Sequence, residues 1–344
     1  HGQSDALEKV THSLCTLEFE SHRLLYDWFL EQLEVPIDQR PYQTEFARLN
    51  FTHTVLSKRL LKKLVEDSVV EGWDDPRMPT ISGLRRRGYP SKSIRDFCQH
   101  IGIAKTNSTH EIELLESFVR TELNQSSQRR MAVIDPVRLT ITNWPEGKIE
   151  YRTAINNPED ESAGTREVPF SGRLFIERED FMEDPPAKFF RLSPGREVRL
   201  RYGYFVTCTD IVKDNSGKVV EILCTYDPET SGGKAPDGRK VKATIHWVEQ
   251  TNCLRGSVAT YDRLFSSERP DLLDDPFEDL NKESLEILES AVFEPAVADI
   301  PSGEVVQFER LGYFCRDESQ LSLFHRTVGL RDEWANIQKR NKSK

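Results

Sequence analysis

The sequence lacks the patterns that identify several common classes of protein. Its six cysteines are scattered, and no two of them have the C-x-x-C spacing of a zinc knuckle or a redox motif. We therefore expect no bound metal, no prosthetic group and no disulfide, and we expect free thiols in a reducing cytoplasm. No apolar run reaches the length of a membrane span, and no basic start followed by an apolar stretch opens the chain.

The chain also lacks an excess of positive charge. Its formal net charge is −10, which argues against a protein covered in basic surface. Local clusters of arginine and lysine can still contact phosphates on an acidic background, so nucleic acid stays possible. The 344 residues are enough for two or three domains. The eight histidines form no metal-ligand or nucleophile pairing.

Residues 1–130 have mainly helical patterns. Apolar residues recur at helical spacing over 21–33, on a face made of Leu24, Leu25, Trp28, Phe29 and Leu33. A second helix is predicted over 80–88, with Thr80 as N-cap and Gly88 as stop, and a third over 90–102, with Ile94, Phe97, Cys98 and Ile101 on one face. A capping box from Ser108 to Glu111 predicts the start of a fourth, with Leu115, Phe118 and Val119 facing one side.

After about residue 130 the pattern changes to short strands separated by turns. Alternating or β-branched stretches lie at 131–144, 148–155, 196–208, 218–227 and 240–248, and turn residues separate them. Many short strands of this kind predict a barrel or a sandwich. An acidic connection follows at 266–286, and the strand pattern resumes at 305–317, so we expect a late strand to return to an earlier sheet.

One short stretch, VLSKR at 55–59, has the composition of a phosphate-binding loop. Lys58 could reach a triphosphate and stabilise charge that builds up as the bond to pyrophosphate breaks, and Ser57 could donate to the same oxygens. By itself, such a stretch more often begins a basic surface helix. The segment at 71–88, EGWDDPRMPTISGLRRRG, is much less common, although it also describes an Asp-Pro turn followed by a helix with three arginines.

These two segments and several others together resemble one family along nearly the whole chain. The matching stretches are 11–19, 46–59, 72–89, 131–137, 168–172, 197–201, 237–248, 261–265 and 308–315. In combination they resemble the glutaminyl-tRNA synthetases, which are class I aminoacyl-tRNA synthetases, and VLSKR matches that family's version of the KMSKS loop. The resemblance implies a multidomain α+β fold: the end of a Rossmann-type catalytic domain, a helical stem-contact domain, and two antiparallel anticodon-binding β-barrels.

The sequence departs from the family in one respect. Class I synthetases carry an HIGH motif, and no H-x-G-H occurs here. We therefore expect a C-terminal portion that lacks the HIGH-containing half, and we expect it to be inactive alone. The resemblance implies a C-terminal part of the catalytic nucleotide-binding domain at 1–53, the KMSKS-type loop and helical domain at 54–128, and two interleaved anticodon-binding barrels at 129–340.

The resemblance also implies roles for individual residues. Ser57 and Lys58 would be catalytic, and ATP would be bound by Thr16, Arg48, Leu49, Leu56, Ser57 and Lys58. Cys15 and Gln43 would line the amino-acid pocket. The tRNA would be bound by Lys105, Thr106 and Asn107 at its inner corner, and at the anticodon by Arg129, Arg191, Arg199, Arg201, Gln307, Glu309 and Arg310.

Strand geometry bears on two groups of the anticodon residues. In 196–202 the arginines at 199 and 201 share one face of a strand, and they could stack on splayed bases. Without the resemblance, a solvated charged face is the favoured interpretation. Gln307 and Glu309 also share a face, whereas Arg310 would point the other way unless a bulge or a strand end intervenes.

The implied function is ATP-dependent attachment of glutamine to its tRNA through glutaminyl-adenylate. ATP would act as a substrate with Mg²⁺, the partner would be a tRNA with a glutamine anticodon, and the protein would be a monomer. One alternative is the archaeal and eukaryal type of glutamyl-tRNA synthetase, in which an arginine is expected where Cys15 stands, because a glutamate side chain needs a cation. Another alternative is a non-catalytic tRNA-binding module.

Overall fold

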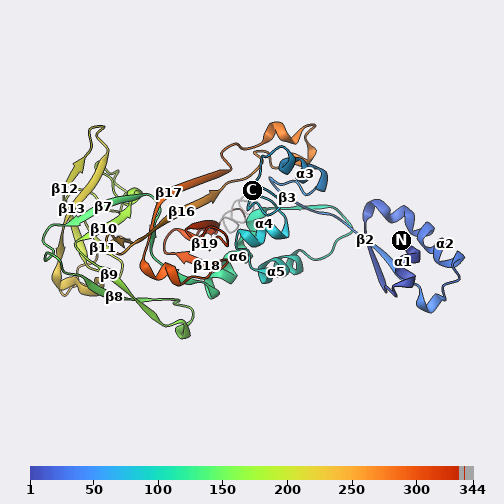
Figure 1. The fold of residues 1–344 in the computed structure, drawn as a ribbon, viewed down its shortest axis with the longest axis horizontal. Helices are drawn as coiled ribbons and strands as arrows, with labels where there is room; N and C mark the ends of the chain where they lie inside the picture. The colour runs from blue at the N-terminus through green and yellow to red at the C-terminus, as the bar shows by residue number, and fades with distance from the viewer. Residues whose placement is uncertain (333–336, 338–344) are drawn as a thin grey trace.

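The computed structural model describes residues 1–332 and residue 337, and the molecule is elongated (Figure 1). A small N-terminal unit lies at one end, helices and one large sheet form the middle, and a second large sheet lies at the other end. No helix in this described part of the chain is both long and apolar enough to span a membrane. The final residues of the third predicted range, 333–336 and 338–340, lie outside the described residues.

The N-terminal unit is a parallel strand pair joined by a helical crossover. It contains α1 (Gly2–Leu7), β1 (His12–Thr16), α2 (Arg23–Gln32) and β2 (Tyr42–Phe46). β1 and β2 pair in parallel, as a strand–helix–strand connection requires. The helix predicted over 21–33 is present as α2, and the apolar face identified from the sequence is not the face that packs against the rest of the unit. All five residues of that face are exposed, and Tyr26 and Leu30 are buried instead, because they are the ones that face the rest of this unit.

The helices of the middle part are α3 (Lys58–Glu66), α4 (Ile81–Arg86), α5 (Ser91–Ile101) and α6 (Ile112–Ser126). The Thr80 cap is confirmed, because its hydroxyl accepts a 2.9 Å hydrogen bond from the amide of Gly83. Gly88 stops α4 as predicted, with φ of +86°. Cys98, on the face predicted for α5, is exposed. One prediction is wrong, because Ser108 is not a helix cap. Ser108 belongs instead to β4 (Ser108–His110), which pairs in parallel with β3 (Leu49–Phe51).

Two seven-stranded sheets form the rest of the chain. The far sheet has the order β14-β11-β12-β13-β7-β10-β15, and the middle sheet has the order β5-β18-β19-β20-β16-β17-β6. The far strands are β7 (Pro136–Ile141), β10 (Arg173–Glu177), β11 (Glu197–Leu200), β12 (Phe205–Lys213), β13 (Val219–Asp227), β14 (Thr244–Ile245) and β15 (Val248–Glu249), with a separate hairpin of β8 (Glu150–Ile155) and β9 (Thr165–Phe170). The middle strands are β5 (Gln128–Arg130), β6 (Ala132–Val133), β16 (Leu254–Tyr261), β17 (Leu285–Phe293), β18 (Val305–Phe308), β19 (Gly312–Arg316) and β20 (Leu323–Gly329).

The two sheets are interleaved in the chain and mixed in direction. β18 pairs with β5, so the predicted return of a late strand to an earlier sheet is confirmed. The prediction of purely antiparallel sheets is wrong at four pairs, because β7–β13, β11–β14, β16–β20 and β5–β18 are parallel. Parallel pairing follows from the long connections of an interleaved chain, since a tight hairpin can join only antiparallel neighbours.

The helices share their apolar core with the middle sheet. One cluster joins Phe97 of α5 and Val119 of α6 to Tyr313 of β19. Another joins Val55 and Leu64 to Phe265, which follows β16. Because protein cores are close-packed, these shared clusters fix the segment before α3 relative to the middle sheet.

Candidate functional site

The VLSKR stretch is anchored at its apolar end and free at its polar end. Val55 is buried and Leu56 is half-buried, each in a cluster of the middle part. Ser57 is the N-cap of α3, but its side chain makes no capping hydrogen bond. Lys58 begins the helix, and its exposed side chain has no hydrogen bond or ion pair among the described residues.

The charges at this helix start are unfavourable for the helix alone. The first turn of α3 contains no acidic residue, and it begins with Lys58 and Arg59. The N-terminus of a helix carries a partial positive charge, so these cations repel it, whereas an anion would be attracted by both. The charges at the start of α3 therefore destabilise the helix slightly by themselves, and a bound anion would relieve this repulsion.

Other residues of the predicted ATP set lie together near the N-terminal unit. Thr16 donates a long 3.5 Å hydrogen bond to Glu18, whose carboxylate lies 3.8 Å from the guanidinium of Arg48. The amide of Arg48 donates a 3.2 Å hydrogen bond to the side chain of Asn107. Leu49 is half-buried in β3, in the same cluster as Leu56. The structure thus brings Thr16 and Arg48 together, but no described contact joins them to Ser57 or Lys58.

The predicted amino-acid pocket residues share one face of the N-terminal strand pair. Cys15 lies opposite Glu45, and Gln43 lies two residues before Glu45 on β2. The side-chain amide of Gln43 donates a 2.9 Å hydrogen bond to Glu45, and Arg23 forms an ion pair with the same buried carboxylate. The hydrogen bonds from Arg23 hold the pKa of Glu45 below its usual value. The half-buried thiol of Cys15 lies 3.9 Å from the imidazole Nε2 of His1.

Arg199 lies on the exposed face of β11. Its neighbours Val198 and Leu200 are buried, as strand alternation predicts. The guanidinium Nε donates a 2.8 Å hydrogen bond to the hydroxyl of Thr244, and Nη1 lies 3.4 Å from the carbonyl of Gly233. No carboxylate contacts Arg199 in the described part of the chain, so its charge stays available to an incoming anion or base.

Arg201 and Glu309 join the two sheets. Arg201, just after β11, forms an ion pair with Glu309, just after β18. The hydroxyl of Tyr202 donates a 3.1 Å hydrogen bond to Glu309, and the guanidinium of Arg201 lies 4.8 Å from the centre of the Tyr202 ring. Burial, reinforced by the charge of Glu309, raises the pKa of Tyr202. These contacts hold Arg201 at the junction of the sheets, with 40% of its side chain exposed.

Asp180 forms ion pairs with two more of the predicted arginines at the same junction, Arg191 and Arg310. Its fully buried carboxylate accepts hydrogen bonds of 2.6 and 2.7 Å from Arg310 and lies 3.3 Å from Nε of Arg191. Arg310 also donates to Nδ1 of His246 at 2.9 Å. β18 ends at Phe308, and Arg310 has φ of +69°, so the strand end turns it away from the direction expected of a regular strand.

The remaining tRNA residues have different environments. Arg129 is buried, and its guanidinium donates to the carbonyls of Ser127 and Asn124, so a base contact by Arg129 has no support in this geometry. Gln307 lies next to Arg129 in the parallel pairing of β5 with β18. The loop residues 105–107 are exposed, beside β4.

Sequence reasoning missed the residues that position the arginines. Asp180, Tyr202 and His246 lie in contact with predicted residues, but they are far from one another in sequence and have no shared spacing. A single buried aspartate in a strand-rich region carries no signal that it will receive two arginines. Among the described residues, no group of three or more histidine, cysteine, aspartate or glutamate side chains is placed to hold a metal ion.

Comparisons with known proteins agree with this arrangement. Residues 1–125 match a family model described as the catalytic domain of class I (E and Q) tRNA synthetases, and residues 127–227 and 244–317 match two models described as their anticodon-binding domain. The chain is 55% identical over 340 residues to a glutamine–tRNA ligase of Nitrobacter winogradskyi, covering 98% of this chain and 60% of that protein. It is 57% identical over 348 residues to one of Rhodopirellula baltica, covering 99% of this chain and 57% of that protein.

A third relative is somewhat less similar. A glutamine–tRNA ligase of Clostridium perfringens is 50% identical over 339 residues, covering 97% of this chain and 61% of that protein. The chain therefore spans about 60% of the length of the curated relatives that it matches. Three family models of the class I (E and Q) tRNA synthetases match in consecutive order and together cover most of the chain, so the chain belongs to this family and comprises a catalytic-domain region followed by the anticodon-binding domains.

Proposed function

We propose that this chain provides the KMSKS-type loop and the anticodon-binding region of an enzyme that attaches glutamine to its tRNA. The observation that carries the proposal is the order of the three matched family models, with VLSKR at the start of α3 inside the first of them. In the proposed reaction, glutamine and ATP form glutaminyl-adenylate and pyrophosphate. The glutaminyl group then moves to the 3′ end of the tRNA.

Lys58 has the properties that the first step needs. The glutamine carboxylate attacks the α-phosphate, and negative charge builds up on the departing pyrophosphate. An unpaired ammonium at a helix start, with Ser57 beside it, can stabilise that charge without first breaking an ion pair. Thr16, Arg48, Leu49 and Leu56 would complete the ATP site, with ATP bound as its Mg²⁺ complex.

The arginines between the sheets would bind the anticodon. Arg199 is exposed without a carboxylate partner, whereas Arg191, Arg201 and Arg310 are held by Glu309 or Asp180. Carboxylates in this position fix the direction of each guanidinium, so less side-chain freedom is lost when a base binds. Residues 105–107 would contact the inner corner of the tRNA, and Gln307 would lie at the anticodon site.

Glutamine is favoured over glutamate as the amino acid. The relatives described above are all glutamine–tRNA ligases. Cys15 offers a neutral thiol where the glutamyl alternative expects a cation, and Gln43 lies on the same strand face. A glutamate side chain bound there would lose its water without gaining a positive partner.

We propose three regions with the boundaries expected from the sequence: 1–53 as catalytic nucleotide-binding part, 54–128 as loop and helical stem-contact domain, and 129–340 as interleaved anticodon-binding barrels. In support, α3 to α6 lie between β3 and β5 in the chain, and β5 is the first strand in the chain that belongs to the middle sheet. Since no H-x-G-H occurs in the sequence, we infer that this chain alone does not catalyse ATP–pyrophosphate exchange. The cytoplasmic location and the monomeric state stay predictions.

Binding of tRNA to variants of Arg199 tests the anticodon site. We expect the chain to bind a tRNA with a glutamine anticodon, with an affinity that falls steeply as salt rises. Arg199→Ala should weaken binding by about 1–3 kcal/mol and relax discrimination at one anticodon base, because a side chain that reads a base edge loses sequence information when it is removed. Fluorescence anisotropy with tRNAs that differ at single anticodon positions would measure both effects.

Arg173→Ala serves as the matched control. Arg173 is an exposed arginine on β10 of the same sheet, and its side chain makes no hydrogen bond or ion pair in the described structure. We expect this variant to change tRNA affinity only slightly. If Arg199→Ala weakened binding equally for every anticodon, Arg199 would be a phosphate contact and the base-reading assignment would be wrong.

A further inference from the structure

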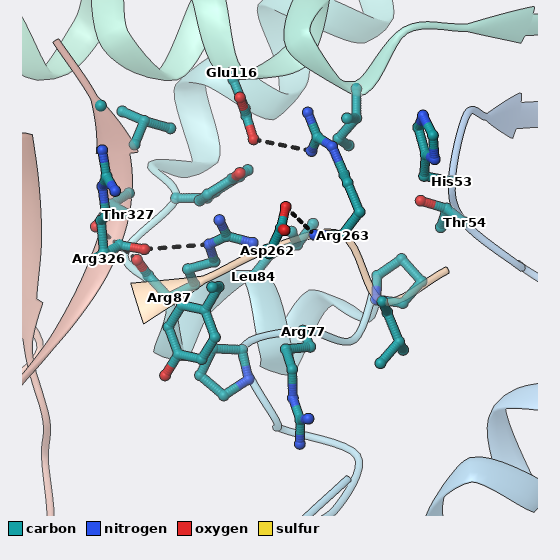
Figure 2. Close-up of a pocket in the computed structure, with 18 of the residues that line it drawn as sticks. His53, Thr54, Arg77, Leu84, Arg87, Glu116, Asp262, Arg263, Arg326 and Thr327 are labelled. Atoms are coloured by element: carbon teal, nitrogen blue, oxygen red, sulfur yellow. Dashed lines mark hydrogen bonds and ion pairs between the residues drawn. The ribbon is translucent and has the colours of Figure 1, made fainter. Parts of the chain in front are cut away.

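A cavity lies between the helices and the middle sheet, with Val55 of the VLSKR stretch and Arg310 of the anticodon set among its lining residues. Its volume is about 540 Å³, within the range of small-molecule sites. Figure 2 shows side chains from α4, α6 and β20 converging on it, with His53 and Thr54 on the far side. The apolar part of its wall includes Leu84, Ile112 and Val328.

Arginines dominate the charged part of the lining. They are Arg77, Arg87, Arg120, Arg263, Arg310, Arg326 and Arg331, against the carboxylates of Glu116 and Asp262. Four of these arginines already have carboxylate partners. Arg77 pairs with Asp75, Arg120 with Asp332, Arg263 with Glu113 and Glu116, and Arg310 with Asp180.

Arg87 is oriented in the cavity without a carboxylate partner. Its guanidinium lies 5.2 Å from the centre of the Tyr261 ring and 5.7 Å from that of Tyr89. Its Nε donates a 3.3 Å hydrogen bond to the backbone carbonyl of Arg326, which Figure 2 shows as a dashed line. The hydroxyl of Thr327 in turn donates a 2.7 Å hydrogen bond to the backbone carbonyl of Arg87.

Arg326 is the second guanidinium without an anion. It is half-buried on β20, and its guanidinium makes no hydrogen bond or ion pair in the part of the chain that the structure describes. Burial lowers the pKa of Arg326, and repulsion from Arg87 lowers it further, although Glu116 acts in the opposite direction. Two guanidiniums that face the same cavity without a counter-ion repel each other, and this repulsion raises the free energy of the folded state.

The wall that carries these arginines is rigid. Gly88 follows Arg87, and a Cβ added there would lie 2.7 Å from side-chain carbons of Cys315 and Val305. The end of α4 therefore packs directly on the middle sheet, and the hydrogen bonds between Arg87 and residues 326–327 hold the Arg87 guanidinium beside β20. Preorganised donors of this kind bind an anion with little loss of freedom.

We propose that this cavity is a binding site for the phosphate group of a small molecule, held between the guanidiniums of Arg87 and Arg326. Phosphate oxygens match the forked donors of arginine, and a dianion neutralises two like charges at once. The apolar wall and the volume leave room for a small organic body attached to the phosphate. The site uses none of the residues proposed for ATP, and of those proposed for tRNA only Arg310 reaches its edge.

Calorimetric titration of the 344-residue chain with inorganic phosphate would test the site, with chloride at equal ionic strength as reference. We expect saturable phosphate binding in the wild-type chain. Arg326→Gln should weaken it by at least about tenfold, the effect of losing a charge-assisted hydrogen bond. Arg326→Lys, which keeps the charge but not the fork, should lie between the two. Arg173→Gln should bind phosphate like the wild type.

Thermal unfolding gives a second measurement, in which the same variant that loses phosphate affinity should not lose stability when phosphate is absent. Without phosphate, Arg326→Gln should be as stable as the wild type or more stable, because repulsion with Arg87 is relieved. At equal phosphate concentration, the wild type and Arg173→Gln should gain more stability than Arg326→Gln, and Arg326→Lys should gain an intermediate amount. Absence of saturable binding in the wild type, or an unchanged phosphate affinity in Arg326→Gln, would overturn the site. Weaker tRNA binding in Arg326→Gln without any phosphate response would assign the arginine to RNA and also overturn it.

Discussion

At the scale of single residues, a buried histidine on β20 holds the carboxylate of Asp317, which in turn contacts α4. Nε2 of His325 lies 2.7 Å from Asp317, and Nδ1 lies 2.6 Å from the hydroxyl of Tyr261. A neutral ring with its proton on Nε2 satisfies both contacts, since the hydroxyl then donates to Nδ1. Asp317 also contacts Arg86 of α4 at 3.2 Å. One of the three consecutive arginines at 85–87 is therefore structural.

The protonation of His325 predicts a dependence of stability on pH. Burial lowers the pKa of His325, although Asp317 acts against this. The folded state then binds fewer protons than the unfolded state, so stability falls as pH drops below the unfolded histidine value of about 6.5. We expect a loss of up to about 1.4 kcal/mol per pH unit in that window. Urea unfolding between pH 7.5 and 5.5 would measure it.

His325→Gln identifies the group responsible. The variant should be less stable than the wild type at pH 7.5, because the hydrogen bonds to Asp317 and Tyr261 are altered. Its stability should change less between pH 7.5 and 5.5, since the titrating ring is gone. The pKa of Asp317 is held low by hydrogen bonds from His325 and Ser319 that outweigh its burial, so its own contribution is lost only at more acidic pH. An unchanged slope in His325→Gln would contradict the assignment.

At the scale of elements, the glycine that ends α4 also allows this helix to pack closely on the middle sheet. The glycine stop predicted from sequence is present, with φ of +86° at Gly88. The same glycine lies against β18, β19 and β20, where a side chain has no space. The left-handed conformation is therefore only part of the reason for glycine at this position.

Gly88→Ala and Gly102→Ala separate the two reasons. Gly102, at the end of α5, also has a left-handed φ of +68°, but nothing lies within 4 Å of an added Cβ. Gly102→Ala should cost only the backbone strain, about 1–3 kcal/mol, because φ of +68° with ψ of −168° is a conformation nearly confined to glycine. Gly88→Ala should cost about 1–3 kcal/mol more, because Cys315 and Val305 must move. Equilibrium unfolding of both variants gives the difference, and equal losses would show that α4 does not pack this tightly on the sheet.

At the scale of the whole molecule, ion pairs join the two sheets at the proposed anticodon site. Arg201 with Glu309, and Arg310 with Asp180, each connect a residue between 127 and 227 to one between 244 and 317. The same side chains would then position the two sheets and bind the tRNA. Changes at this junction are expected to affect stability and tRNA binding together.

Asp180→Asn tests whether these ion pairs hold the two sheets together. The fully buried carboxylate is the partner of Arg310, and its loss leaves guanidiniums unpaired, so we expect a destabilisation of about 3–5 kcal/mol. Asp184→Asn is the control, since Asp184 is exposed and has no partner in the described structure. Asp180→Asn combined with Arg310→Gln should lose less than the sum of the single changes. A strictly additive result in denaturant unfolding would show that the pair does not couple the sheets.

The sequence by itself determined the local structure and the family. Thr80 and Gly88 bound a helix because capping and left-handed φ are local properties, and Val198 and Leu200 are buried around an exposed Arg199 because strand periodicity is local. VLSKR could be placed at a helix start for the same reason.

Only the tertiary structure decided which partners those local elements meet. Ser108 could have capped a helix, but the pairing of β4 with β3 uses it in a strand. Four apolar residues of α2 are exposed, because the face that packs is set by what lies beside the helix; they are Leu24, Leu25, Trp28 and Phe29. Asp180 receives two arginines and Arg129 is buried through long-range packing. Such contacts join residues far apart in the chain, where periodicity and capping carry no information.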